Sequence, residues 1–431
     1  MNFSLSKSRI VDVAFYTMTF SIIVSLNSLV YLLFGINQVA SPIILLCSAT
    51  ILTLLGISRK SFDNTGIKLL YATLAFYAVL GTIVRLHSID IEYRVSIFYV
   101  INNFLTSLVV IMAVHQYGYN RMIKERKEPI FFNAIYLPIL ISVFYAVYQS
   151  LTGQVSLRGD DSGGRILGLY GNPNILGYVA NLFLVLTIYT IYKHKKYTII
   201  KFPLLLTAVY VSILSGSRTA MATAVAIILF SIVWLTFNFS RTSSGVKFKY
   251  IFVAGIPIFL MTLFVTQFDY ILDNYATYSQ AKRIRLLKAL AVDGEVTGKT
   301  TAGRTHVVEF GLNRISESPI IGHGGGYFVN FPSKYGFEHG IHNTYLLVFG
   351  DAGVFAFLLM ISFILYIWIR SLVLSPLIAL IAIGCVLVWA MQCIGSHNGL
   401  NDKIMNIQIM TAAIYVMYGL SGQSVPIKKL A

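Results

Sequence analysis

The chain has 431 residues, of which 56% are hydrophobic and only 12% are charged, and its mean hydropathy is +0.73. Soluble domains carry about a quarter charged residues, so this composition excludes an ordinary soluble protein. The formal net charge of +16 does not indicate nucleic-acid binding, because the basic residues lie in short clusters between apolar segments. Such clusters fix the topology of membrane proteins and contact anionic lipid headgroups of the bilayer.

Apolar runs long enough to cross a bilayer as helices recur from end to end. The first, from Ile10 to Phe34, is too long for the core of a signal peptide. The sequence therefore predicts an all-α membrane protein with about twelve transmembrane helices. The expected spans are 10–34, 39–57, 67–84, 95–115, 130–151, 172–192, 202–215, 219–238, 250–268, 342–367, 372–394 and 404–421.

The loops between these spans form two sets with very different charge. One set holds most of the Lys and Arg, including the cluster from Arg121 to Lys127. The opposite short loops hold only six basic residues, which are Arg85, Arg94, Arg158, Arg165, Arg218 and Lys403. Because cytoplasmic loops carry the excess of basic residues, we expect both termini in the cytoplasm and the second set outside.

This topology divides the chain into four parts. Residues 1–160 hold the N-terminal transmembrane helices, and 161–268 hold core helices with Arg165 and Arg218. Residues 269–341 form a long external loop, and 342–431 hold the C-terminal helices. Within the loop, 275–290 has the pattern of a helix lying in the membrane interface, and 305–316 is also expected to be helical. Loops of this length usually carry function.

Arg218 stands in the segment 215–219, Ser-Gly-Ser-Arg-Thr, between two spans at the external side. A charge at a membrane boundary must snorkel to water or find a partner. Gly216 and the two serines favour a tight polar turn, whereas a lone arginine here is also compatible with a snorkelling anchor. The sequence leaves both interpretations open.

Arg165 precedes the segment 168–174, Gly-Leu-Tyr-Gly-Asn-Pro-Asn, which opens the sixth span. Asn172 is suited to cap that helix, and Pro173 is suited to its first position. A capped helix explains these two residues but not Arg165 or Asn174. A helix N-terminus beside an arginine also favours an anion.

Two further motifs lie on the long loop. Arg304 precedes the expected helix, and a run of glycines at 322–326 follows it. These glycines predict a flexible turn or a close approach of backbone to a ligand. The segment 338–343, Glu-His-Gly-Ile-His-Asn, opens the tenth span, where His339 and His342 are placed to share a helical face. The pair lacks a third metal ligand, so we expect no metal site.

Arg165, Arg218, Arg304 and His342 are all expected on one side of the membrane. Arginine binds phosphate through bidentate, charge-assisted hydrogen bonds. A histidine among cations is a suitable general base, because its ordinary pKa is about 6.5 and neighbouring cations favour the neutral form. The set is typical of a pyrophosphate site beside a base.

The ordered motifs around Arg165, Arg218, Arg304 and His342-Asn343-Thr-Tyr, with Gly353, resemble the O-antigen ligase and polymerase superfamily. The resemblance covers roughly 160–360. It implies a GT-C type membrane glycosyltransferase of the bacterial inner membrane with a periplasmic active site. It also implies a donor glycan on undecaprenyl pyrophosphate, inversion at the anomeric carbon, no cofactor and no obligatory metal.

The resemblance also implies roles for individual residues. His342 matches the proposed base, and Arg218 and Arg304 match arginines that hold the pyrophosphate. Around them we expect substrate contacts from Arg165, Asn172, Asn174, His339 and Asn343. The acceptor hydroxyl belongs to lipid A–core in a ligase and to another lipid-linked repeat unit in a polymerase.

One position departs from the ligase pattern, which places Gly, Thr or Tyr three residues after the glycine that Gly353 matches. This chain has Ala356 there, which tilts the prediction towards a polymerase. The main alternative is a secondary transporter with about twelve helices, but these usually show internal repeats and buried charges near the midplane. A purely structural membrane partner is a third possibility, and it leaves the ordered motifs unexplained.

Overall fold

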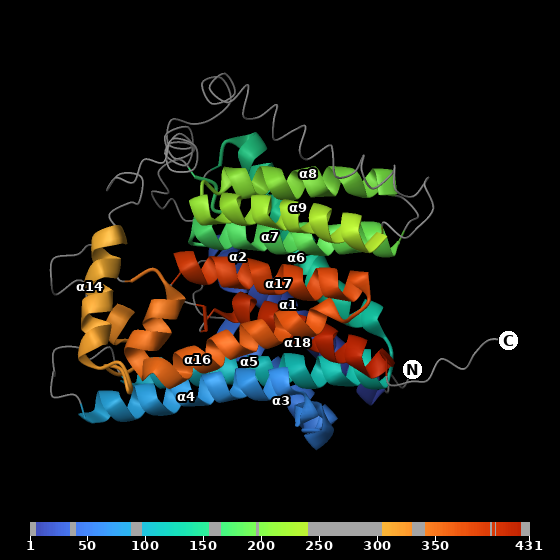
Figure 1. Cartoon of the computed structure of the whole chain (residues 1–431). Helices are drawn as coiled ribbons and strands as arrows, with labels where there is room; N and C mark the ends of the chain where they lie inside the picture. The colour runs from blue at the N-terminus through green and yellow to red at the C-terminus, as the bar shows by residue number, and fades with distance from the viewer. Residues whose placement is uncertain are drawn as a thin grey trace.

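The computed structural model describes residues 6–34, 40–87, 97–154, 165–194, 198–239, 304–329, 341–396, 399–400 and 402–423. Within these ranges the chain forms helices and no strand (Figure 1). The helices are α1 (Lys7–Ile23), α2 (Leu26–Phe34), α3 (Ala40–Leu55), η1 (Arg59–Asp63), α4 (Thr65–His87), α5 (Ile97–Gly118), η3 (Tyr119–Lys124), α6 (Glu128–Thr152), α7 (Pro173–Lys193), α8 (Thr198–Leu214), α9 (Arg218–Phe239), α14 (Arg304–Glu317), α16 (Thr344–Leu372), α17 (Pro376–Gly395) and α18 (Lys403–Gln423).

Apart from η1, η3 and α14, these helices fall on the spans expected from hydropathy, with ends that differ by a few residues. Six described helices are long and apolar enough to cross a membrane, namely α4, α6, α7, α16, α17 and α18. This finding supports a multi-pass membrane protein. The expected span at 250–268 and the expected interfacial helix at 275–290 lie outside the described residues.

The first expected span is divided in two, which the apolar pattern did not reveal. Helix α1 ends at Ile23, and α2 begins at Leu26 after Ser25, whose φ is 51°. The carbonyl of Ile23 accepts hydrogen bonds from Tyr170 Oη at 2.6 Å and Ser142 Oγ at 3.3 Å. Backbone groups in a bilayer need internal partners, so these two hydroxyls help to make the break tolerable.

Helix α7 lies at the centre of its group of helices and is almost completely buried. It packs against α6, α8, α9 and α17. Small residues permit this close packing, since a Cβ on Gly177 would lie 2.5 Å from Cβ of Ala220. Asn181 on the same helix donates to the carbonyl of Ala220 at 2.8 Å and fixes α9 against α7.

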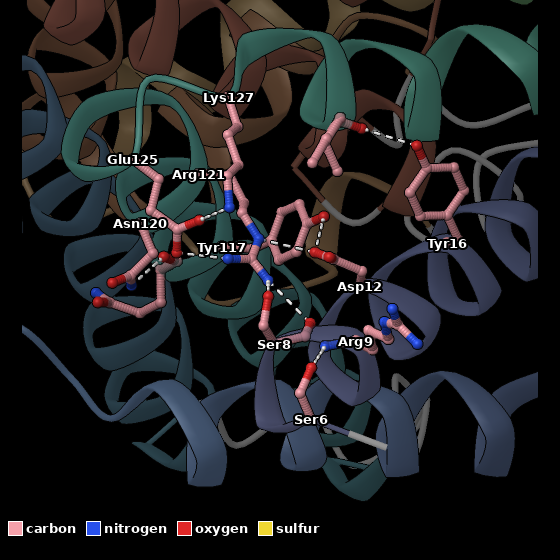
Figure 2. A network of polar contacts seen from close by, with 12 residues as sticks. Ser6, Ser8, Arg9, Asp12, Tyr16, Tyr117, Asn120, Arg121, Glu125 and Lys127 are labelled. Atoms are coloured by element: carbon pink, nitrogen blue, oxygen red, sulfur yellow. Dashed lines mark hydrogen bonds and ion pairs between the residues drawn. The ribbon is translucent and has the colours of Figure 1, made fainter. Parts of the chain in front are cut away.

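The start of α1, the helix η3 and the end of α18 lie together at one end of the bundle. Arg121 Nε donates to Asp12 Oδ1 at 2.7 Å, and Nη2 donates to the carbonyl of Ser8 at 2.9 Å (Figure 2). Arg121 also pairs with Glu125, and Arg126 donates to the carbonyl of Ser421 at 3.3 Å. The basic cluster from Arg121 to Lys127 therefore lies at this end of the bundle, which by the sequence prediction faces the cytoplasm.

Candidate functional site

Arg165 lies at the opposite end of the bundle and joins two helices. Its Nε donates to the carbonyl of Ser215 at 2.9 Å, and its Nη2 donates to Oδ1 of Asn174 at 3.0 Å. The backbone N–H of Ile166 adds a bond to the carbonyl of Leu214 at 3.3 Å. The partly exposed guanidinium thus connects the end of α8 to the first turn of α7.

The turn that presents Arg218 is tight and polar, which is one of the two interpretations that the sequence left open. Gly216 has a φ of 59°, and a Cβ there would lie 3.1 Å from Cγ of Arg165. Ser215 Oγ accepts from the N–H of Ser217 at 3.2 Å, and Ser217 Oγ accepts from the N–H of Ala220 at 3.3 Å. Arg218 is consequently the first residue of α9, where the helix dipole favours negative charge.

The start of α7 confirms the predicted cap. Asn172 is the N-cap residue, its Oδ1 accepts from the N–H of Asn174 at 2.8 Å, and Pro173 is the first helical residue. Because Asn174 also accepts from Arg165, the cap and the guanidinium form one unit. Capping thus uses the side-chain oxygen of Asn172, and its amide nitrogen is the group that remains suited to a substrate.

His342 precedes α16 instead of lying on it. Residues 341–343 are not helical, and Asn343 caps the helix by accepting from the N–H groups of Tyr345 and Leu346 at 3.0 and 3.2 Å. The shared helical face expected for the two histidines is therefore wrong for His342. That residue is partly exposed, and His339 lies outside the described residues.

The end of α17 brings the starts of α9 and α16 to one place. Thr344 Oγ1 donates to the carbonyl of Ser396 at 2.6 Å and accepts from the N–H of Gly399 at 3.1 Å. On the other side, a Cβ on Gly395 would lie 2.5 Å from Oγ1 of Thr219. Arg218 directly precedes Thr219, and His342 stands two residues before Thr344, so both flank the same corner.

Arg304 begins α14, which stands across this end of the bundle, away from the labelled chain termini (Figure 1). A Cβ on Gly311 would lie 2.4 Å from Cδ1 of Ile341, the residue just before His342. Helix α14 thus packs beside the segment that carries His342. The side chain of Arg304 lies outside what the structure describes.

The glycine-rich segment closes against a break in α16. Gly353 has a φ of 77°, and a Cβ there would lie 1.9 Å from the carbonyl oxygen of Ile320. The N–H of Val354 donates to the carbonyl of Pro319 at 2.9 Å, and the N–H of His323 donates to the carbonyl of Gly350 at 2.7 Å. The sequence predicted a flexible turn or an approach of backbone to a ligand, whereas the structure shows this backbone in close contact with α16.

Asp351 anchors this segment, and sequence reasoning assigned it no role. The fully buried carboxylate accepts from the N–H groups of Gly326 at 2.7 Å and Phe328 at 3.1 Å. Tyr77 of α4 donates to it at 3.0 Å. A carboxylate inside an apolar span is a usable signal, because such groups are retained only with partners or a function.

The described helices indicate a multi-pass membrane protein, and Arg165, the Arg218 turn and the His342 segment lie at one end of it. Residues 202–361 match the family model described as O-antigen ligase. The match includes Arg218, Arg304, His342 and Gly353, and it confirms the predicted resemblance to the O-antigen ligase and polymerase superfamily. It indicates an O-antigen ligase-type function in surface glycan assembly and does not favour a transporter. No match was found among curated proteins.

Proposed function

We propose that the protein transfers a glycan from undecaprenyl pyrophosphate to an acceptor hydroxyl at the periplasmic face of the inner membrane. The observation that carries this proposal is the meeting of the Arg218 turn and the His342 segment at the end of α17. That corner lies opposite the basic cluster around Arg121, which by the positive-inside rule faces the cytoplasm.

In this reaction His342 accepts the proton of the attacking hydroxyl as its oxygen bonds to the anomeric carbon. The bond from that carbon to the pyrophosphate oxygen breaks, and the configuration inverts. Negative charge grows on the leaving pyrophosphate, and Arg218 and Arg304 stabilise it without an obligatory metal ion. Asn343 orients the histidine by capping α16.

For Arg165 the proposal adds a positioning part to the substrate contact expected from the sequence. Two of its nitrogens are engaged by Ser215 and Asn174, so its main task is to hold the turn that presents Arg218. Its partly exposed guanidinium can contact an outer oxygen of the pyrophosphate as well. Asn172 and His339 remain proposed contacts for the glycan.

Between the two members of the superfamily, we favour a polymerase, which joins lipid-linked repeat units. Ala356, the position that departs from the ligase pattern, is fully buried in α16 and follows Gly353 by one turn. A ligase would use lipid A–core as its acceptor.

Gel profiles of surface polysaccharide test this function. A deletion strain is complemented with the wild type, with His342→Ala, and with His194→Ala as a control at an exposed position at the opposite end. We expect the wild type and the control to restore long chains, and His342→Ala to fail at equal protein level. In the deletion strain, a single capped repeat unit indicates a polymerase, and loss of all capped chains indicates a ligase. Normal profiles with His342→Ala would contradict the proposal.

A further inference from the structure

A cavity of about 340 Å³ lies at the same end of the bundle as the proposed transfer site, and the reaction described above does not use it. This volume lies within the usual range of ligand pockets, roughly 300–1,000 Å³. It is bounded by the break between α1 and α2, by the starts of α3 and α18, and by the segment that leads into α7.

The break in α1 creates this space. If α1 continued as a helix, the side chains of residues 24–27 would occupy this space. Ser25, with its φ of 51°, changes the direction of the chain instead. Asn27 then holds the start of α3, because its Oδ1 accepts from the N–H of Ala40 at 2.7 Å. Ser21, Ser25, Asn27 and Ser41 all line the cavity.

The floor of the cavity carries both signs of charge. Asp402 and Lys403 line it at the start of α18. Both backbone bonds to the Asp402 carboxylate, from Ile404 at 2.8 Å and Met405 at 3.0 Å, end on Oδ1. Its Oδ2 is therefore the oxygen suited to accept from a ligand, while Lys403 is suited to donate.

Apolar groups complete the lining in a way that suits one class of ligand. Ile22, Ile44, Ile175 and Ile404 line the same space as the polar side chains. A sugar ring has the same character, with hydroxyl groups at its edge and C–H groups on its faces. A lipid tail would leave Oδ2 of the Asp402 carboxylate without a hydrogen-bond donor, which is costly in an apolar setting.

The cavity and the transfer site share one wall. Tyr170 and Ile175 line the cavity, and Asn174 between them accepts from Arg165 on the transfer-site side. The Tyr170 hydroxyl donates to Ile23 and so fixes this wall to the break in α1. If the pyrophosphate is held near Arg218, only the segment 170–175 therefore separates the glycan from this polar cavity.

We infer that this cavity binds a sugar unit of the glycan during transfer, with Asp402, Lys403 and the hydroxyl groups around Ser25 as its hydrogen-bonding partners. This inference rests on the proposed function and adds a second subsite to it. The sugar belongs either to the donor chain or to the acceptor chain, and both present the same hydroxyl-rich chemistry.

The test narrows the cavity without touching the transfer residues. Ser41→Leu adds bulk to the cavity wall, and Ala49→Leu adds bulk to an exposed position on the same helix as the matched control. Asp402→Asn removes the charge but keeps a good helix cap, since Asn and Asp cap equally well. The assay uses purified full-length protein in nanodiscs with lipid-linked repeat units from the strain.

We expect Ser41→Leu and Asp402→Asn to raise KM at least tenfold with kcat changed less than about twofold, because they weaken binding away from the reacting atoms. A raised KM for the donor assigns the cavity to the donor chain, and a raised KM for the acceptor assigns it to the acceptor chain. Ala49→Leu is expected to keep both values.

Direct binding separates this inference from the proposed function. The probe is a soluble oligosaccharide of two repeat units, titrated into His342→Ala protein, which we expect to bind it without transfer. Ser41→Leu protein should bind it at least tenfold more weakly. Unchanged binding and KM in an active Ser41→Leu protein would overturn the cavity assignment and leave the function standing. If wild-type protein transfers no glycan at all, it is the proposed function that fails.

Discussion

Alanine in place of Gly353 is expected to detach the segment 318–328 from α16. The residue has a φ of 77°, and its new Cβ would lie 1.9 Å from the carbonyl oxygen of Ile320. No side chain can rotate to relieve this contact, because the obstacle is backbone. The segment must move, and the bonds from Val354 to Pro319 and from His323 to Gly350 are then lost.

The expected loss of folding free energy has two contributions, the backbone conformation of the residue and the contact of its new Cβ. With a φ of 77° and a ψ of −178°, Gly353 is in a region that costs a residue with a Cβ about 1–3 kcal/mol, and overpacking a filled site costs about 1–3 kcal/mol more. Gly56 separates the two contributions, because its φ is 70° but no atom lies within 4 Å of its Cβ position. We therefore expect Gly56→Ala to cost about 1–2 kcal/mol and Gly353→Ala roughly 2–6 kcal/mol.

The assay is thermal unfolding of the two variants and the wild type, purified in the same detergent. Gly353→Ala should lower Tm clearly more than Gly56→Ala, and it should also reduce glycan transfer, because α14 directly precedes the displaced segment and would move with it. Equal Tm values for the two variants would refute the reasoning, since the backbone contact would then have no cost of its own.

Two further predictions concern charged groups at opposite ends of the bundle. Arg165→Lys keeps the charge but cannot form the two directed bonds, so we expect at least about tenfold lower transfer activity, measured at saturating donor; wild-type activity would count against a positioning role. Burial opposes ionisation of Glu125, but Lys127 and Arg121 outweigh it and lower the pKa of Glu125 below its ordinary value. Because the pKa of Glu125 is lower in the folded protein, its ionised carboxylate stabilises the fold at pH values above the unfolded pKa of about 4.3. This stabilisation is lost as the pH falls through the folded pKa. Glu125→Gln should therefore lower Tm at pH 7 and match the wild type in acid, whereas a Tm difference independent of pH would contradict this.

Local signals were sufficient for much of this structure. Hydropathy predicted the described spans because each helix must be apolar over the width of a bilayer. The cap at Asn172, the turn before Arg218 and the helix at 305–316 also followed from short-range rules on capping and turns. The family motifs then predicted which of these polar turns form one site.

Features that depend on contacts between distant segments did not follow from the sequence. The run of apolar residues through Ser25 gives no sign that Tyr170 and Ser142 satisfy a broken helix there. Asp351 is separated from Tyr77 by most of the chain, so their bond could not be anticipated. His342 was expected on a helix, but the capping preference of Asn343 moved the helix start beyond it.

Transfer by purified protein in proteoliposomes is the measurement closest to the central claim. Lipid-linked repeat units are supplied, and both the lengthened glycan and the released undecaprenyl pyrophosphate are quantified over time. We expect His342→Ala to lower kcat by about 10²–10⁴, the usual contribution of a general base, and Arg218→Ala to lower it comparably by removing charge from the leaving group. His194→Ala should keep the wild-type rate. Wild-type turnover in His342→Ala protein would contradict the account.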